Sequence, residues 1–382
     1  MVTARPAYDL AAVGVMSGTS LDGLDVCLCR FRFDNGAWRY DIVAAETTAY
    51  PAALAGQLAT AQQTSALQFA KFHADYGTYI GEAVRRFIDR HGVQPALVAS
   101  HGHTVFHQPE RRFTCQVGSG AHIAAAAAVD TVCDFRSTDV ALGGQGAPLV
   151  PVGDRLLFPD YAYCLNLGGF ANISYEEKTQ RTAYDICAVN YVLNHYIRTV
   201  GLDYDRDGAT AASGAVDARL LDDLDGLDFY ARQAPKSLGR EWVEQAVFPV
   251  IDRSPASLAD KLRTYCEHAA RQIGKAAGGG TVLVTGGGAH HSFLMERIAA
   301  HAKGALHVPD ACLVDYKEAL IFAFLGVLYY INQPNCLASV TGAEVDSIGG
   351  AMYKSPQSPA GALAIRRITA SEAPRGGVEV LK

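Results

Sequence analysis

The sequence lacks the marks of several common protein classes. Its nine cysteines are scattered and form no Cys-x-x-Cys pair, which favours buried free thiols in a reducing cytoplasm. It has no lysine- or arginine-rich block and a net charge of −6, so nucleic acid is not expected as a partner. No stretch approaches the roughly 20 apolar residues of a membrane span, and the N-terminus shows no signal-peptide pattern. We therefore expect a cytoplasmic protein with no membrane association.

Two common nucleotide-binding motifs are also missing from the sequence. There is no G-x-x-x-x-G-K-[ST] loop, which excludes the P-loop class. No G-x-G-x-x-G follows a strand-like run, so a dinucleotide-binding fold has no support. Any nucleotide site must therefore be built from other turns.

Length and composition indicate a globular protein with two domains. The chain has 382 residues, of which 49% are hydrophobic and 19% charged. One hydrophobic core rarely extends over so many residues. We expect an N-terminal domain over residues 1–150 and a C-terminal domain over residues 151–353, with an Asp-, Gly- and Pro-rich surface insertion at about 203–257. Residues 354–382 are expected to form a peripheral tail.

The order of the expected elements repeats between the two halves. Three strand-like runs open each half, at residues 8–16, 24–33 and 38–50 in the first and at 162–167, 170–175 and 182–186 in the second. Further strands are expected at 96–99, 131–133 and 281–284, and helices at 66–90, 119–128, 189–200, 258–277, from 292 onward, and at 317–330. The repeated order suggests duplicated α/β domains facing a cleft.

Three glycine-containing turns follow apolar strands and are candidates for phosphate binding. They are Gly18-Thr19-Ser20, Gly168-Gly169 and Gly286-Gly287-Gly288. Glycine lets a backbone N–H approach an oxyanion closely, and Ser and Thr hydroxyl groups add donors. Asp22 and Asp25 lie just beyond the first turn, where a carboxylate suits Mg²⁺. A single turn of this kind is often only structural, but three together favour a nucleotide site.

The motifs around these turns resemble a known family. The run Met16–Asp25 (MSGTSLDGLD) and the run Gly143–Pro148 (GGQGAP) are similar to the signature of the anhydro-N-acetylmuramic acid kinases, in the sugar kinase, Hsp70 and actin superfamily. Further segments that resemble the family in the same order are residues 100–104, 134–139, 165–174, 235–241, 285–289, 317–319 and 340–343. The resemblance spans nearly all of residues 10–353. It implies an α/β fold with two duplicated actin-like (ribonuclease H-like) ATPase domains flanking a cleft.

The resemblance also implies an activity. Members of the family open 1,6-anhydro-N-acetylmuramic acid hydrolytically and phosphorylate O6 with ATP, which gives N-acetylmuramic acid 6-phosphate in peptidoglycan recycling. ATP and Mg²⁺ are the implied cofactors, with Asp22 as the Mg²⁺ ligand, and a homodimer is the implied assembly. The positions that match the family's ATP-binding motifs are Gly18, Thr19, Ser20, Leu21, Asp22, Gly23, Leu24, Asp25, Gly168, Gly169, Asn172, Gly286, Gly287, Gly288 and Ala289.

Asp185 matches the family's catalytic base, which takes a proton from the water that attacks the anomeric carbon. Without the resemblance, an Asp at a strand end would be read as a turn or cap residue. The family motif after this residue is Asp-Thr-Gly-Pro-Gly-Asn, whereas this chain has Asp-Ile-Cys-Ala-Val-Asn over residues 185–190. The Asp and Asn190, a candidate substrate ligand, are kept, but the glycines are not. This departure concerns the shape of the loop and its contacts with the sugar.

Arg136 and Glu318 are the other candidate substrate ligands. A guanidinium group binds a carboxylate in a bidentate manner, so Arg136 suits the lactyl carboxylate of the substrate. An ion pair between Arg136 and Asp134 or Asp139 is an equally good interpretation. Glu318 is expected near the start of a helix, where a carboxylate is favourable with or without a function.

Three alternatives stay open. His101, His103 and His107 have spacings that would suit a metal on a helix, but a strand and turn are expected here, where such residues do not converge. A levoglucosan-type anhydro-sugar kinase would share the ring-opening chemistry without needing Arg136 as a carboxylate ligand. A non-catalytic ATP-binding sugar sensor would have no use for Asp185 as a base.

Overall fold

The computed structural model describes residues 8–18, 21 and 23–358. The chain forms two compact units: unit 1 holds residues 1–141, 319–335 and 348–382, and unit 2 holds residues 142–318 and 336–347. These units differ from the expected ranges, because the chain leaves unit 1 at residue 141 and later returns to it twice. The cleft that we expect between two domains stays a prediction.

Unit 1 is built on a mixed sheet with the order β13-β7-β4-β1-β2-β3. Its strands are β1 (Tyr8–Ser17), β2 (Leu24–Asp34), β3 (Ala37–Thr48), β4 (Leu97–Ser100), β7 (Thr131–Cys133) and β13 (Ala351–Tyr353). β1 to β3 form an antiparallel meander, and β4 and β7 continue it in parallel with β1. Asn35 and Gly36 join β2 to β3 with positive φ at both residues, as a tight hairpin turn requires.

Unit 2 repeats this arrangement with the order β10-β9-β8-β11-β12. Its strands are β8 (Tyr163–Leu167), β9 (Phe170–Glu177), β10 (Gln180–Ala188), β11 (Thr281–Thr285) and β12 (Ala305–His307). β8 to β10 are antiparallel, and β11 and β12 are parallel to β8. Apart from the added β13, both sheets therefore have one strand order and one set of directions, which confirms the duplicated α/β architecture.

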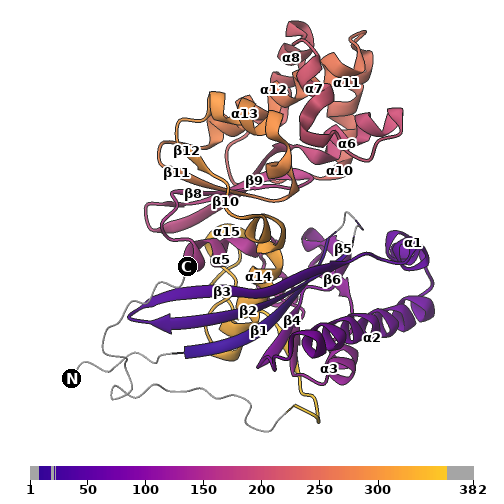
Figure 1. Cartoon of the computed structure of the whole chain (residues 1–382), viewed down its shortest axis with the longest axis vertical. Coiled ribbons are helices and arrows are strands. Elements are labelled where there is room, and N and C mark those ends of the chain that lie inside the picture. Colours follow the sequence, from indigo (N-terminus) through magenta and orange to yellow (C-terminus); the bar gives the residue numbers. More distant parts are fainter. Residues whose placement is uncertain (1–7, 19–20, 22, 359–382) are drawn as a thin grey trace. The chain divides into compact units, whose positions relative to one another are not determined.

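Helices cover both sheets (Figure 1). They are α1 (Ala52–Thr60), α2 (Ala66–His91), α3 (Gly120–Ala127), α4 (Ser137–Ala141), α5 (Val150–Leu157), α6 (Asn190–Ile197), α7 (Ala209–Ser213), α8 (Ala218–Asp225), α9 (Asp228–Ala231), α10 (Arg240–Trp242), α11 (Phe248–Arg253), α12 (Leu258–Ala276), α13 (Ser292–His301), α14 (Ala311–Tyr330) and α15 (Ala338–Thr341). α14 passes from unit 2 into unit 1 between Glu318 and Ala319.

The central strand β1 of the first sheet is covered on both faces. Val13 and Val15 pack with α2 and α3 in one hydrophobic cluster. On the opposite face, Gly14 lies so close to the backbone of Ala319 in α14 that an added Cβ would overlap it. Burial on both faces explains why β1 is an almost continuous apolar run rather than an alternating one.

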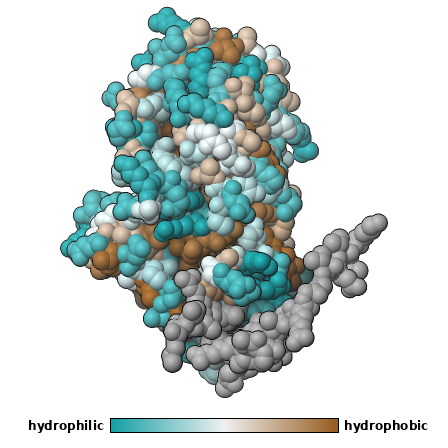
Figure 2. Space-filling view, turned by 90° about the vertical axis from the view of Figure 1, so that its left-hand side faces the viewer, coloured by the Kyte–Doolittle hydropathy of each residue, from teal (hydrophilic) through white to brown (hydrophobic). Residues whose placement is uncertain are grey.

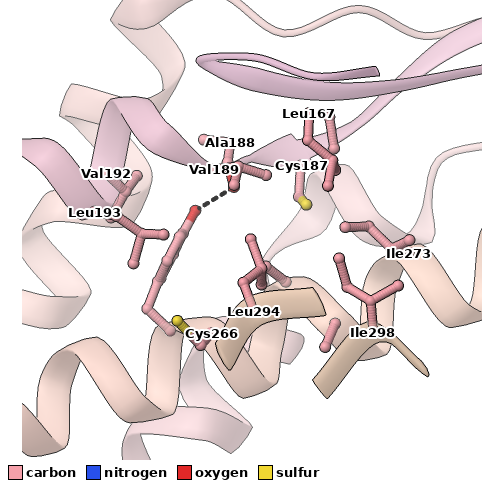
Figure 3. Packing of buried hydrophobic residues seen from close by; sticks show 14 of the residues in the cluster. Leu167, Cys187, Ala188, Val189, Val192, Leu193, Cys266, Ile273, Leu294 and Ile298 are labelled. Atoms are coloured by element: carbon pink, nitrogen blue, oxygen red, sulfur yellow. Dashed lines mark hydrogen bonds between the residues drawn. The ribbon is translucent and has the colours of Figure 1, made fainter. Parts of the chain in front are cut away.

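The second sheet has one apolar face and one partly polar face. The apolar face packs on α6, α12 and α13, and Figure 3 shows Val192 and Leu193 of α6 close to Cys266 of α12. The other face packs on α5 and α15. It carries polar side chains, which are described with the candidate site.

Several elements were not predicted from the sequence. They are the hairpin of β5 (His103–Gln108) and β6 (Phe113–Val117), the edge strands β12 and β13, and the helices α1, α4, α5, α7 to α11 and α15. The segment 203–257 folds into short helices on unit 2, and residues 236–238 within it contact β10. The first residues of the expected tail are tied to unit 1, because Lys354 and Ser355 bind Asp130.

Hydrophilic residues dominate the upper part of the space-filling view, which unit 2 forms (Figure 2). Apolar residues are scattered among them and form no large patch there. Among the helices that the structure describes, none is both long and apolar enough to cross a membrane.

Candidate active site

The first candidate phosphate loop connects β1 to β2. Thr19, Ser20 and Asp22 lie outside the described residues, so their predicted roles in ATP and Mg²⁺ binding stay predictions. Leu21 has a φ of 62°, and its N–H donates to the carbonyl oxygen of Gly18 at 3.4 Å. Leu21 therefore takes a backbone conformation that is rare for a branched side chain.

The far side of this loop is fixed by β3. A Cβ on Gly23 would come within 2.7 Å of the Thr47 side chain and 2.8 Å of the Thr48 carbonyl oxygen, so the site requires glycine. Leu24 begins β2 and is buried in the core, so only its backbone is suited to contact a nucleotide. The carboxylate of Asp25 accepts a hydrogen bond from the Thr47 hydroxyl at 2.6 Å.

A chain of polar side chains anchors the end of β1 just before the loop. The Tyr50 hydroxyl donates to the Ser17 hydroxyl at 2.8 Å and lies 2.8 Å from the Tyr76 hydroxyl. Ser17 Oγ is 3.1 Å from Nδ1 of His103. Burial raises the pKa of Tyr50 to about 12. Tyr50 therefore stays neutral near pH 7, and these hydrogen bonds fix the point at which the loop begins.

The second hairpin turn is held by the start of α6. The Gly169 carbonyl oxygen accepts hydrogen bonds from the N–H groups of Val189 and Tyr191, and that of Gly168 accepts one from Asn190. The Gly168 N–H donates to Phe170. The turn is thus joined to the segment that follows Asp185.

The triple glycine packs directly on this turn. Gly286 has a φ of 86°, and a Cβ there would come within 2.5 Å of Asn166 Oδ1 and 2.9 Å of the Leu167 carbonyl oxygen. A Cβ on Gly288 would come within 2.8 Å of the Leu167 side chain. Gly287 faces the amide of Asn190, which would lie 3.9 Å from a Cβ there.

Two of the three predicted glycine turns therefore meet in unit 2, together with Asn190. We predicted Asn190 as a sugar ligand, but its amide lies beside the turn that we assigned to adenosine. The Ala289 N–H closes the triple-glycine turn by donating to the Gly286 carbonyl oxygen at 2.8 Å.

A row of polar residues crosses four strands of the second sheet. Asp185 on β10 pairs with Asn172 on β9, Asn172 pairs with Asn166 on β8, and Asn166 pairs with Thr285 on β11. Residues paired in register project from the same face of a sheet, so these side chains lie in line. Thr285 is fully buried, and its hydroxyl has no hydrogen-bond partner in the part of the chain that the structure describes. A buried polar atom of this kind is typical of a site that a ligand or water completes.

Asp185 has the environment of a base that is poised near neutrality. It lies three residues before the end of β10, beside a bulge in the pairing with β9. Burial raises its pKa to about 6, against the lowering effect of a hydrogen bond from the Leu238 N–H at 2.9 Å. The Asp185 N–H in turn donates to Lys236 at 3.0 Å. The segment Lys236–Leu238 is therefore hydrogen-bonded to β10 and holds the carboxylate in one orientation.

The altered segment after Asp185 is not a loop, because residues 186–188 are the last residues of β10, and it belongs to the core rather than to the polar row. Ile186, Cys187, Ala188 and Val189 are all buried in the main hydrophobic cluster of unit 2. Figure 3 shows Cys187 and Val189 among the apolar side chains, with a hydrogen bond from the Tyr265 hydroxyl to the Ala188 carbonyl oxygen at 2.9 Å. Since the family's glycines are absent, side-chain packing fixes the backbone of residues 186–189.

An ion pair joins α14 to α5, the helix that packs on the polar face of the second sheet. Lys317 Nζ lies 2.8 Å from Asp154 Oδ1 of α5, and both side chains are buried. The other Asp154 oxygen accepts from the Ser174 hydroxyl at 2.5 Å, and Arg181 donates to Ser174. Although burial alone lowers the pKa of Lys317, the adjacent carboxylate raises it overall, so the ammonium group of Lys317 stays charged.

Glu318 follows this lysine and is half-buried. We expected it in the first turn of a helix that begins at residue 317, but α14 begins at Ala311. Glu318 is therefore two turns into the helix, and the interaction of a carboxylate with a helix N-terminus does not explain it.

Arg136 lies in unit 1 and contacts a histidine. Its Nε and Nη2 groups point at Nε2 of His101, at 3.1 and 2.8 Å. Asp134, one of the two carboxylates considered as its partner, instead accepts hydrogen bonds from Ser137 at the start of α4. Within the described residues, no group of three or more His, Cys, Asp or Glu side chains could hold a metal ion.

Sequence reasoning missed Asn166, Thr285, the base-orienting segment 236–238 and the link between His101 and Arg136. Asn166 and residues 236–238 fall within segments that carry the family resemblance, which was the available signal. The strand register that aligns Asn166 and Thr285 with Asp185 is a long-range property that no local pattern reveals.

Comparison with known proteins agrees with these motifs. The family model described as anhydro-N-acetylmuramic acid kinase matches residues 10–355. Proteins named anhydro-N-acetylmuramic acid kinase from Shewanella baltica (strain OS223), Vibrio vulnificus and Vibrio cholerae are 34%, 36% and 35% identical over 89% of this chain and 98%, 97% and 97% of theirs.

Solved structures give a much weaker similarity. The activator of the 2-hydroxyisocaproyl-CoA dehydratase from Clostridium difficile with bound ADPNP has a TM-score of 0.40 and 12% identity, covering 85% of this chain and 97% of that one. This likeness supports no argument about the site. On the family model and the curated relatives, the chain belongs to the anhydro-N-acetylmuramic acid kinase family.

Proposed function

We propose that this chain is the kinase that opens 1,6-anhydro-N-acetylmuramic acid with water and phosphorylates O6 with ATP, as part of peptidoglycan recycling. Membership of the family makes it a phosphotransferase with an alcohol group as acceptor. The single observation that supports this chemistry best is Asp185, whose pKa of about 6 lies in the range of an effective general base.

In the proposed reaction Asp185 takes a proton from a water molecule as its oxygen bonds to the anomeric carbon. The bond between the anomeric carbon and O6 breaks, and O6 then attacks the γ-phosphorus of ATP while ADP leaves. The Leu238 N–H keeps the carboxylate oriented through its hydrogen bond at 2.9 Å. A sugar sensor would not need this arrangement.

The proposed phosphate contacts are the loop Gly18–Asp25, with the β- and γ-phosphates, and the turn Gly168–Gly169. The residues Gly286–Ala289 are proposed to lie against adenosine. Asn172 and Asn166 offer amide donors without adding negative charge, which suits a site for an anion. Positioning and electrostatic stabilisation supply most of the catalysis of phosphoryl transfer.

Mg²⁺ is proposed as the second cofactor, held by Asp22 with Asp25 as a further oxygen donor. The donor chemistry fits, because Asp25 presents a hard carboxylate ligand next to the loop and Thr47 hydrogen-bonds one of its oxygens. When bound, the ion would neutralise charge on the phosphates. A homodimer in the cytoplasm is proposed from the family alone.

Arg136, Glu318 and Asn190 are the proposed sugar ligands. Arg136 would bind the lactyl carboxylate, Glu318 a sugar hydroxyl, and Asn190 a group at the border between sugar and nucleotide. The buried segment Ile186–Val189 is proposed to shape the sugar-binding region through its backbone.

Turnover on two sugars tests the proposal. ADP release with 1,6-anhydro-N-acetylmuramic acid and with levoglucosan, each followed by mass analysis of the phosphorylated product, separates the two kinases. We expect the larger kcat/KM on the muramic acid sugar. Faster use of levoglucosan would overturn the substrate assignment, and ATP binding without any phosphorylated product would indicate a sensor.

A further inference from the structure

The histidines that we first considered as metal ligands have a different set of contacts. Nδ1 of His101 lies 2.9 Å from the Gly102 carbonyl oxygen, which can only accept a hydrogen bond. Nδ1 must therefore carry the ring hydrogen, and Nε2 is left as an acceptor. Both N–H groups that approach Nε2 belong to Arg136, so the two neighbours demand the same tautomer.

His101 is held in the neutral state. Its ring is only 6% exposed, and burial followed by the positive charge of Arg136 lowers its pKa well below the usual value. A neutral acceptor orients the guanidinium group without cancelling its charge, unlike an ion pair with a carboxylate. His101 uses the Nε and Nη2 edge, whereas the Nη1 and Nη2 edge has the fork geometry that binds a carboxylate in a bidentate manner.

Both residues occupy the part of the sheet where ligands usually bind. His101 directly follows β4, and Arg136 comes three residues after β7, the parallel neighbour of β4. Ligands of open α/β sheets bind at the carboxyl ends of the strands. The His101 ring also packs against Phe322 of α14, with ring centroids 4.8 Å apart and the planes tilted by 50°, which adds a contact from a third element of unit 1.

We propose that His101 is a positioning residue that orients the guanidinium group of Arg136 for the substrate's carboxylate and so sets the preference for a carboxylate-bearing anhydro-sugar. The inference rests on the proposed function, in which Arg136 binds that carboxylate. His101 itself does not touch the substrate. Its effect on selectivity is separate from proton transfer, which we assign to Asp185.

The test compares His101→Leu and His101→Gln on two sugars, 1,6-anhydro-N-acetylmuramic acid and 1,6-anhydro-N-acetylglucosamine, which lacks the lactyl carboxylate. We expect His101→Leu to raise KM for the first sugar about tenfold with kcat little changed, and to leave kcat/KM for the second unchanged. The amide oxygen of Gln can accept from Arg136, so His101→Gln should recover most of the preference. Equal losses on both sugars, or no loss, would overturn the inference.

Controls separate a failure to fold from a loss of selectivity. His122→Leu removes an exposed histidine on α3 and should change neither KM nor the thermal midpoint. If His101→Leu does not fold, His101→Asn takes its place, because its shorter amide cannot span the distance to Arg136. If the His101→Asn variant then prefers the carboxylate-bearing sugar as strongly as the His101→Gln variant does, the proposal is contradicted.

Arg136→Ala separates the proposed role of His101 from the proposed role of Arg136. If it abolishes the preference for the carboxylate-bearing sugar and the His101 variants keep it, only the role of His101 is wrong. If Arg136→Ala keeps the preference, the proposed carboxylate site and the role of His101 both fail.

Discussion

The two sheets have the same strand order, yet the two parts of α14 make different kinds of contact in the two units. In unit 1 the contact is apolar and very close, with Gly14 against Ala319 and Phe31 at 5.3 Å from Phe324. In unit 2 the contact is a buried ion pair between Lys317 and Asp154. A repeated scaffold can thus use one face for packing in one copy and for polar chemistry in the other.

The two sheets also differ in the residues that lie in line across their first three strands. In unit 1 the residues in line across β3, β2 and β1 are Thr47, Asp25 and Met16, whereas unit 2 has Asp185, Asn172 and Asn166 across β10, β9 and β8. The carboxylate has moved from the second strand to the third. A carboxylate on the second strand suits a cation beside the phosphates, and amides there suit the phosphates themselves.

Lys317→Met should have the largest effect on folding stability, because it removes the buried ion pair by which α14 contacts unit 2. It leaves Asp154 buried without its main partner, which typically costs about 3–5 kcal/mol of folding free energy. Chemical denaturation measures the loss. Adding Asp154→Leu should restore part of the stability, and a fully stable Lys317→Met single variant would show that the pair is not needed.

Asp185→Asn should lower kcat by more than about 10²-fold, because an amide cannot take the proton from water. ATP binding, measured by calorimetry, should stay unchanged. Asp160→Asn, an exposed turn residue, is the matched control and should be silent. A loss of less than about tenfold in Asp185→Asn would remove Asp185 from the role of base.

Gly14→Ala tests the close apolar contact between β1 and α14 in unit 1. The added methyl group would overlap the backbone of Ala319, so β1 or α14 must shift, and overpacking of this kind costs about 1–3 kcal/mol. Gly56→Ala, at an open position on α1 with no neighbour within 4 Å, should instead be neutral or slightly stabilising. Equal melting temperatures of the two variants would contradict the close contact.

The dependence of kcat on pH tests the difference between Asn172 on β9 and Asp25, which has the corresponding position on β2 in unit 1. Since protonated Asp185 cannot act as a base, kcat should rise with pH through a midpoint of about 6. Asn172→Asp makes the row in unit 2 resemble that in unit 1 and places a second carboxylate beside Asp185. Like charges raise each other's pKa, so the midpoint should move upward by about one unit. A wild-type midpoint near 4 would mean that burial does not act on Asp185 in solution.

Local sequence patterns were sufficient for the repeated strands and their glycine turns. The alternation and turn residues of β1 to β3 and β8 to β10 are properties of short segments, and the duplication followed from their order. The path of α14 was not predictable, because its two parts belong to different units and only long-range contacts decide this. Its start at Ala311 was missed because Asp315 and Lys317 interrupt the apolar pattern of its first turns.

The candidate site was predicted in part. Asp185 and the glycine turns came from the family resemblance, and the structure adds why Asp185 is suited to its role, namely burial and the Leu238 N–H. The contacts of Arg136 could not be predicted, since His101 is 35 residues away and comes close only because β4 and β7 are neighbours. An ion pair with Asp134 or Asp139 was one of two equally good expectations for Arg136, and the structure adds the imidazole of His101 as a partner.

The central claim is that water opens the anhydro ring at the anomeric carbon before O6 is phosphorylated. Reaction of ATP with 1,6-anhydro-N-acetylmuramic acid in ¹⁸O-labelled water, followed by mass spectrometry of the product, tests it directly. We predict one labelled oxygen at the anomeric carbon and an unlabelled phosphate on O6. Label in the phosphate, or an unlabelled product with the anhydro ring intact, would contradict this account.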